Sequence, residues 1–256
     1  MSQRTQEAVV VERFGVQAAA YLNSAVHSAG ADLAALLALA HGKSSARVLD
    51  LGCGGGHVAY GAAPHVGEVV AYDLSQQMLD VVASTAAARG LANLTTQQGP
   101  AERLPFADHS FDLILSRYTA HHWRDFEAGL REAVRVLKPG ARAGFVDVVS
   151  PGRALQDTFL QAIEVLRDTS HVRDRSRAEW EDCAARAGFA GANVTAFKIR
   201  IDFPSWIVRM NTPPEMATAI RALQTAVADD VRRYFAIEDD GSFTFDVVLF
   251  EFLAPG

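Results

Sequence analysis

Short apolar runs alternate with stretches of helical periodicity through the first half of this chain, and this alternation restricts the fold most. The apolar runs are rich in β-branched residues and lie at 47–51, 68–73, 111–116 and 143–149. One intervening stretch places its apolar residues on a single helical face behind the candidate N-cap Ser75; these residues are Met78, Leu79, Val82 and Ala86. Strands that alternate with helices predict βαβ units and a mainly parallel sheet. Strands that are apolar throughout further predict helices on both faces.

Helix-ending residues and a change of periodicity after Pro151 indicate where further helices begin and end. Arg89-Gly90 is expected to end the helix that begins after Ser75, and Lys138-Pro139-Gly140 the next one, whose apolar stripe is Phe126, Leu130, Val134 and Leu137. After Pro151 a helical stripe follows at Leu155, Phe159, Ala162 and Leu166. Ser176 to Glu179 has capping-box spacing, and Gly188 would end that helix.

The last third of the chain adds two predicted strands and a helix between them. The strands are expected at 193–201 and 243–252. Thr212 is the expected N-cap of the helix, whose apolar residues are Met216, Ile220, Leu223 and Val227. We therefore predict an α/β, Rossmann-like, doubly wound sheet of seven strands with an inserted helical cap. Residues 1–256 would form a single domain, with 46–150 as its core and 1–45 and 151–240 as substrate-side elements.

Composition limits the classes of function. Of the 256 residues 49% are hydrophobic, which is enough for a sizeable core, and the formal net charge of −6 disfavours a nucleic-acid substrate. The two cysteines, Cys53 and Cys183, have no metal-ligand spacing and suit a reducing compartment. The longest apolar stretch, 31–40, is interrupted by Asp32 and is too short to span a membrane. A cytoplasmic protein without a membrane span is expected, and its oligomeric state stays open.

The first apolar run ends in a glycine-rich turn, Asp50-Leu51-Gly52-Cys53-Gly54-Gly55-Gly56. Glycines directly after a strand allow a sharp turn and a close approach of the backbone to a ligand. The dinucleotide fingerprint requires a further glycine where this chain has His57, so the nicotinamide pattern fails. An acid at Asp50 would repel a pyrophosphate but can support an ammonium or a sulfonium group.

The second apolar run ends in another acid, Asp73. A carboxylate at this position can accept hydrogen bonds from both ribose hydroxyls of an adenosine. S-adenosylmethionine combines such a ribose with an ammonium, a carboxylate and a sulfonium, and it has no phosphate. The two acids and the glycine turn therefore favour S-adenosylmethionine as the ligand.

Several separate motifs resemble, in order and spacing, the class I S-adenosylmethionine-dependent methyltransferases. The stretch 48–57 resembles their motif I, and 99–106 resembles the segment that lines adenine. Phe111-Asp112, His121-His122-Trp123 and Arg135-Val136-Leu137-Lys138-Pro139-Gly140 resemble the methyltransferase type 11 group, which includes the ubiquinone and menaquinone C-methyltransferases. The resemblance covers residues 46–150.

The resemblance implies roles for individual residues. Asp50, Gly52 and Gly54, with Cys53 in the same turn, would contact the methionine part of the cofactor, and Asp73 the ribose. Ala101 would donate its backbone N–H to adenine, while Leu74 and Met78 would pack on the adenosine or belong to the core. Many relatives carry an acid where this chain has Pro100, and Glu102 either takes its place or faces solvent.

The segment 116–123 is expected at the carboxyl edge of the sheet, where ligands bind in open α/β folds. In the family it borders cofactor and substrate, which makes Arg117 a cofactor-binding candidate and His121 and His122 catalytic candidates. His122 and Trp123 could instead pack a helix against the sheet. Metal binding is not expected, because adjacent histidines point in different directions and no third ligand has recognisable spacing.

The N-terminal stretch 14–24 is expected to form a helix over the cofactor. Relatives often place an aromatic hydroxyl there, so Tyr21 is a further catalytic candidate, whereas His27 is expected on the surface. The charged run 167–182 reads most simply as a solvated helical face, although its arginines could serve an acidic group of a substrate.

The predicted function is transfer of a methyl group to a small-molecule acceptor that is hydrophobic or aromatic. Residues 151–240 supply suitable apolar side chains, among them Phe159, Phe203, Trp206, Ile207 and Met210. Two alternatives stay open: a non-catalytic module that binds S-adenosylmethionine or S-adenosylhomocysteine, and a nicotinamide-dependent reductase on the same architecture. The acceptor, the methylated atom and the catalytic base are not fixed by the sequence.

Overall fold

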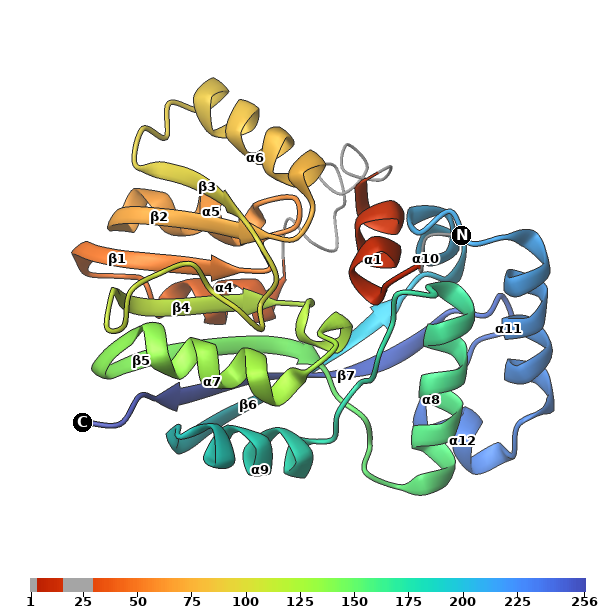
Figure 1. The fold of residues 1–256 in the computed structure, drawn as a ribbon. Coiled ribbons are helices and arrows are strands. Elements are labelled where there is room, and N and C mark those ends of the chain that lie inside the picture. Colours follow the sequence, from red (N-terminus) through yellow and green to blue (C-terminus); the bar gives the residue numbers. More distant parts are fainter. Residues whose placement is uncertain (1–3, 16–29) are drawn as a thin grey trace.

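The computed structural model describes residues 4–15 and 30–256, and a seven-stranded sheet forms its centre (Figure 1). The strand order is β3-β2-β1-β4-β5-β7-β6, in which the first five strands are parallel and β7 is antiparallel to both of its neighbours. The strands are β1 (Lys43–Leu51), β2 (Val66–Asp73), β3 (Leu94–Gln98), β4 (Phe111–Arg117), β5 (Leu137–Val148), β6 (Ala190–Ile201) and β7 (Phe243–Leu253). The predicted α/β, doubly wound fold with seven strands is confirmed.

Helices cover both faces of the sheet, as the apolar strands predict. Along β1, Val48 packs into one hydrophobic cluster and Leu49 into another on the opposite face, and β4 alternates in the same way. The first face carries α4 (Ala31–Ala38), α5 (His57–Ala62) and α6 (Gln76–Ala88). The second face carries α7 (Phe126–Val136) and α9 (Arg177–Ala187).

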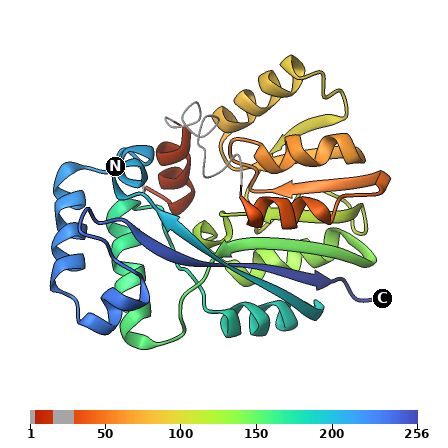
Figure 2. The ribbon, with the colours of Figure 1, turned by 180° about the vertical axis from the view of Figure 1, so that it is seen from behind.

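The remaining helices form a cap beyond the carboxyl ends of β4 and β5 (Figures 1 and 2). They are α1 (Gln6–Gly15), α8 (Ala154–Arg167), α10 (Phe203–Arg209), α11 (Pro214–Ala226) and α12 (Asp229–Tyr234); the 3-10 turns η1 (Ala63–His65) and η2 (Ala120–His122) complete the chain. In both views α1 lies between α6 and the other helices of the cap, at the edge where β1 and β2 end. None of the helices in the described ranges is long and apolar enough to cross a membrane.

Local sequence signals were accurate for α6 and α9. The buried residues of α6 are the four that the periodicity indicates, and the Ser75 hydroxyl accepts a hydrogen bond from the backbone N–H of Met78. Ser176 and Glu179 form the predicted capping box of α9, and Gly188 follows this helix with φ +107°. Both ends are set within a few residues, so tertiary packing does not change them.

Other predictions at this level were wrong. Leu137 begins β5 instead of ending α7, because its backbone pairs with Phe111 of β4. In α8 the buried apolar residues are Phe159, Leu160 and Ile163, whereas Leu155 is 52% exposed, since the helix packs against α11 and α12 with its other face. Pro213, not Thr212, caps α11. The Thr212 hydroxyl instead donates to the carbonyl of Arg167 and ties this loop to α8.

Candidate functional site

A first cavity lies at the carboxyl ends of β1, β2 and β4, beneath α1. The glycine turn forms its floor, with Gly52 at φ +75° and Gly54 at φ +47°, both in the left-handed region that favours glycine. A side chain at Gly54 would meet no other atom within 4 Å, so open space lies directly over this backbone. The remaining wall comes from other elements: Gln6, Val10, Phe14, Tyr72, Leu74, Met78, Ala101, Glu102, Arg117 and Thr119.

Asp73 stands on the wall of the first cavity at the end of β2. One carboxylate oxygen accepts a hydrogen bond from the N–H of Gly54 at 2.9 Å, and the other from the N–H of Ser75 at 2.9 Å. These bonds lock the carboxylate against the glycine turn, and each oxygen keeps a lone pair for a ligand. Burial raises the pKa of Asp73, although the backbone hydrogen bonds oppose this effect. Glu102 also lines the cavity and accepts the N–H of Asp125.

Asp50 lies behind the turn and does not line the first cavity. Its Oδ2 accepts the N–H of Ala59 in the first turn of α5 at 2.9 Å, and its Oδ1 has no hydrogen-bond partner among the described residues. The carboxyl is 1% exposed, and burial raises its pKa to about 8. Its contact with a ligand stays a prediction, while its position at the start of a helix supports the turn directly.

A buried ion pair connects the first cavity to α4. Arg117, at the end of β4, contacts Asp32 at 2.7 Å, and both side chains are almost completely buried. The hydroxyl of Tyr118 donates to the same carboxylate at 3.1 Å, and Tyr118 has φ +54°, an uncommon conformation for an aromatic residue. Asp32, which interrupts the apolar run 31–40, is therefore the anchor for two residues of the cavity wall.

A second cavity adjoins the first, and the two share Phe14, Tyr118 and His122 as lining residues. One side of the second cavity is apolar and comes from β5, β6, β7 and α10; its residues are Val148, Ile199, Ile201, Trp206, Phe245 and Val247. The other side is polar and comes from η2, α8, α10 and the loop after α8: His121, Glu164, Arg167, Asp168, Asp174 and Arg209. A molecule in the second cavity would therefore meet a molecule in the first at the shared residues.

The neighbouring residues His121 and His122, which both line the second cavity, differ in charge. His121 Nδ1 lies 2.6 Å from Asp147 Oδ1, at the end of β5. Burial alone would lower the pKa of His121, but the charge of Asp147 and this hydrogen bond raise it to about 9. His122 donates from Nδ1 to the carbonyl of Ser170 at 3.1 Å, and burial together with the charge of His121 lowers its pKa to about 4. At neutral pH His121 is therefore an imidazolium and His122 a neutral imidazole.

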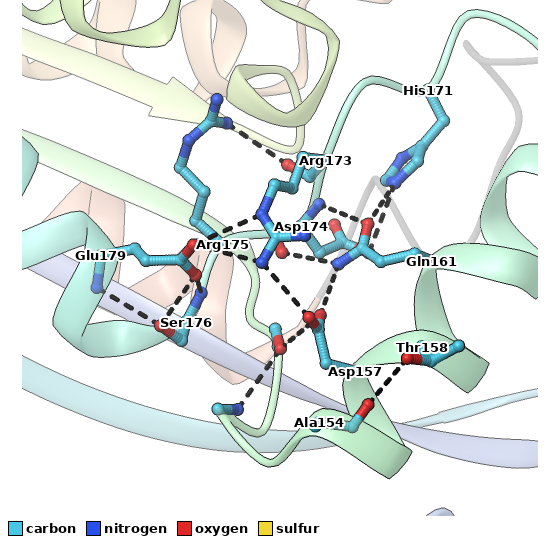
Figure 3. A network of polar contacts seen from close by, with 12 residues as sticks. Ala154, Asp157, Thr158, Gln161, His171, Arg173, Asp174, Arg175, Ser176 and Glu179 are labelled. Atoms are coloured by element: carbon cyan, nitrogen blue, oxygen red, sulfur yellow. Dashed lines mark hydrogen bonds and ion pairs between the residues drawn. The ribbon is translucent and has the colours of Figure 1, made fainter.

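The loop between α8 and α9 is fixed by a network centred on Gln161 (Figure 3). Its Oε1 accepts from His171 Nε2 at 2.9 Å and from the N–H of Asp174 at 3.1 Å. Its Nε2 donates to the carbonyl of Asp174 at 2.7 Å and to Asp157 at 2.9 Å. This network sets the backbone of Asp174, whereas its carboxylate Oδ2 has no hydrogen-bond partner in the described part of the chain.

The interpretation of 167–182 as a solvated helical face was wrong for its first half. Asp168, Ser170, His171 and Asp174 are all buried, and Asp168 contacts Arg13 of α1 at 3.6 Å. Arg173 and Arg177 pair with acids of the same region, while Arg167 lines the second cavity. Sequence patterns do not distinguish a charged run that closes a polar cavity from one that faces solvent.

Some residues of the site were missed from the sequence. Asp147 carried a usable signal, since it is an acid at the carboxyl end of an otherwise apolar strand. Phe14 belongs to α1, which ends at Gly15. A helix over the ligand was predicted at 14–24, and its residues 16–24 lie outside the described part of the chain. Tyr21 and His27 also lie outside the described residues.

One group of side chains has the composition of a metal site. Ligand atoms of His121, Asp147 and Asp174 all lie within 4.8 Å of one another. Asp147, however, already accepts three hydrogen bonds, from Nδ1 and the backbone N–H of His121 and from the N–H of Val148. We therefore treat Asp147 as the residue that orients His121.

Comparisons with known proteins agree with this geometry. The family described as "Methyltransferase domain" matches residues 49–145. The uncharacterized protein YafE of Escherichia coli is 50% identical over 76% of this chain and 94% of its own length. The uncharacterized methyltransferase YcgJ of Bacillus subtilis is 36% identical over 88% of each chain. The crystal structure of YcgJ superposes on this chain with a TM-score of 0.84 and 34% identity, covering 88% of this chain and 98% of YcgJ. A 2-phytyl-1,4-naphtoquinone methyltransferase of Synechococcus elongatus is 37% identical over 60% of this chain and 66% of that one.

Proposed function

The chain belongs to the methyltransferase family whose domain spans residues 49–145, and we propose that it moves the methyl group of S-adenosylmethionine to a small hydrophobic or aromatic acceptor. The observation that carries this proposal is the pair of adjoining cavities. A donor in the first cavity and an acceptor in the second would meet at Phe14, Tyr118 and His122.

The residues of the first cavity suit S-adenosylmethionine. Asp73 is a fixed carboxylate for the ribose hydroxyls, and the open space over Gly54 admits a ligand against the backbone. Leu74, Met78 and Ala101 supply an apolar wall for the adenine, while Cys53 lies in the turn below. Arg117 lines the same cavity as a cation near the expected carboxylate of the methionine part. When bound, the cofactor supplies a methyl group already activated by its sulfonium.

The chain's own contribution to the reaction is chiefly alignment. Methyl transfer is an in-line displacement, and well-aligned reactants gain about 7–11 kcal/mol at most from positioning. The shared residues of the two cavities belong to α1, to the segment directly after β4 and to η2, so the packing of α1 over the site helps to set donor and acceptor in register. We propose that residues 46–150 hold the cofactor and that the cap selects the acceptor within one domain.

The apolar side of the second cavity suits an aromatic acceptor. Ile199 and Ile201 of β6 and Phe245 and Val247 of β7 line this cavity together with Trp206 of α10, whose ring packs edge-on against Phe245. A quinol is one member of this class, and a naphtoquinone methyltransferase is among the similar proteins.

The test is methyl transfer to a panel of quinol, phenol and amine acceptors, followed by mass spectrometry. Ile199→Trp should fill part of the second cavity and lower kcat/KM for the acceptor by at least tenfold, while the affinity for S-adenosylhomocysteine stays unchanged. Val194→Trp is the matched control, because Val194 lies on the same strand, is half-buried and does not line the cavity. Cofactor binding without methylation of any acceptor would contradict the proposal.

A further inference from the structure

Asp174 is a buried carboxylate on the wall of the second cavity. Among residues 4–15 and 30–256 its Oδ2 has no hydrogen-bond partner, and His171 Nε2 lies 4.0 Å from it. The exposure of Asp174 is 1%, and its backbone is held at both N–H and C=O by Gln161. A buried carboxylate oxygen without a hydrogen bond is costly, and a catalytic role is one of the recognised reasons for such a group. In the second cavity such a role would act on the acceptor, on the premise of the proposed function.

His121 lies beside Asp174 and is already protonated. A ring nitrogen of His121 and a carboxylate oxygen of Asp174 lie within 4.8 Å, less than twice the hydrogen-bond length of about 2.8 Å. Both side chains therefore border the same part of the second cavity. His121 gives Nδ1–H to Asp147, which leaves Nε2–H as a donor and no nitrogen that could accept a proton.

The other acids around the second cavity are poorer proton acceptors. Asp168 takes hydrogen bonds from the N–H and hydroxyl of Ser170, and these groups with His122 hold its pKa below the usual range despite burial. Burial raises the pKa of Glu164 as well, but Arg167, 3.8 Å away, opposes that rise. Asp147 already accepts three hydrogen bonds. Most of the charged groups that act on Asp174 are acids. Burial raises its pKa most, the charges of Glu164, Asp147 and Asp157 raise it further, and the charge of His121 opposes them. His171 is neutral and bonded to Gln161.

We propose that the second cavity takes a hydroxylated aromatic acceptor, with Asp174 as the catalytic base and His121 as the donor that holds the reacting oxygen. The hydroxyl proton passes to the carboxylate of Asp174. The oxygen forms a bond to the methyl carbon, the carbon–sulfur bond breaks, and its electron pair stays on sulfur. The products are a methyl ether, a neutral thioether and protonated Asp174, which returns its proton to solvent.

The first arm of the experiment is kinetic and uses whichever phenol or quinol of the panel turns over. Asp174→Asn should lower kcat by about 10²–10⁴-fold and remove the rising limb of the pH profile, with KM for S-adenosylmethionine unchanged. His121→Gln should remove the falling limb near pH 9, where the imidazolium loses its proton. Asp182→Asn, an exposed acid of α9, is the control with the same charge change and should leave the profile intact.

The second arm needs no turnover and therefore separates this inference from the proposed function. Titration calorimetry of the protein loaded with S-adenosylhomocysteine would compare 4-ethylphenol with 4-ethylanisole, which lacks the hydroxyl proton. The wild type should prefer the phenol at least tenfold, and Asp174→Asn should remove that preference.

Four results would overturn the assignment. The first is a wild type that binds both probes equally or binds neither. The second is an Asp174→Asn variant that retains kcat, and the third is a rising limb that disappears with His121→Gln instead. Inactivation by EDTA with recovery on Mg²⁺ or Zn²⁺ would also replace proton transfer with metal ligation by the same side chains. Failure of every acceptor with intact probe discrimination would reject the methyl transfer and keep the role of Asp174 in binding.

Discussion

Asp73 performs two tasks with one carboxylate, because it fixes the glycine turn and presents free lone pairs to the first cavity. We expect Asp73→Asn to weaken binding of S-adenosylhomocysteine by about tenfold to a hundredfold, since charge-assisted hydrogen bonds to the ribose are lost. Calorimetry would measure the affinity, and circular dichroism would check that the variant is folded. Asp80→Asn on the exposed face of α6 is the matched control. An unchanged affinity would remove Asp73 from the cofactor site.

His121 makes the stability of the folded chain depend on pH. Its pKa is raised from 6.5 to about 9 in the folded chain, so the native state binds this proton more tightly than the unfolded state. The resulting stabilisation is fully present below about pH 6.5 and is lost as the pH rises through 9. Asp147→Asn should lower the pKa of His121 and flatten this part of the stability curve.

Two measurements check the behaviour of His121. Imidazole NMR follows its titration directly, and urea unfolding at several pH values gives the free energy of unfolding. His122, with a pKa of about 4, serves as the internal comparison, because it should stay neutral throughout this range. A His121 that titrates near 6.5 in the wild type would contradict the ion pair.

At the scale of elements, α1 is the part of the cap that touches both cavities. Arg13 holds it there, donating to the carbonyls of Arg167 and Met210. We expect Arg13→Met to loosen α1 and speed the release of S-adenosylhomocysteine by roughly tenfold, as expected for the loss of a hydrogen bond from a charged donor. Stopped-flow fluorescence would measure the rate.

Arg4→Met is the control for this prediction. Arg4 precedes α1 and pairs with Glu12 on the exposed surface, where ion pairs contribute little. Its release rate should therefore match that of the wild type. Equal rates in Arg13→Met and the wild type would mean that α1 does not retain the ligand.

At the scale of the whole molecule, ligand binding should be visible as stability. A ligand that binds only the native state adds about 2.7 kcal/mol at a hundred times its Kd, which raises Tm by roughly 5–10 °C in a chain of this size. We expect this shift with S-adenosylhomocysteine and none with NAD, because His57 replaces the glycine that a pyrophosphate would need. Differential scanning calorimetry with both ligands decides, and a shift with NAD alone would favour a nicotinamide-dependent enzyme.

The sequence by itself determined the features whose causes are local. The positions of β1, β2, β4 and β5 follow from apolar runs that are buried on both faces. The polar strand β3 has no such run and was not located from the sequence. The ends of α6 and α9 follow from caps that lie within four residues. Gly52 and Gly54 are recognisable because their φ angles favour glycine, and Asp73 because it ends a strand beside them. The order of these motifs was enough to predict the family.

Only the tertiary structure decided how distant charges combine. Asp174 reads in the sequence as one acid of a solvated run, yet the packing of α8 buries it beside His121 and Asp147, more than 25 positions away. The hydrogen bond between His121 and Asp147 likewise needs η2 and β5 side by side. Charge states depend on burial and on neighbours across the fold, and neither quantity is a property of adjacent residues. That is why the sequence indicated a methyl donor, while the polar half of the second cavity had to come from the fold.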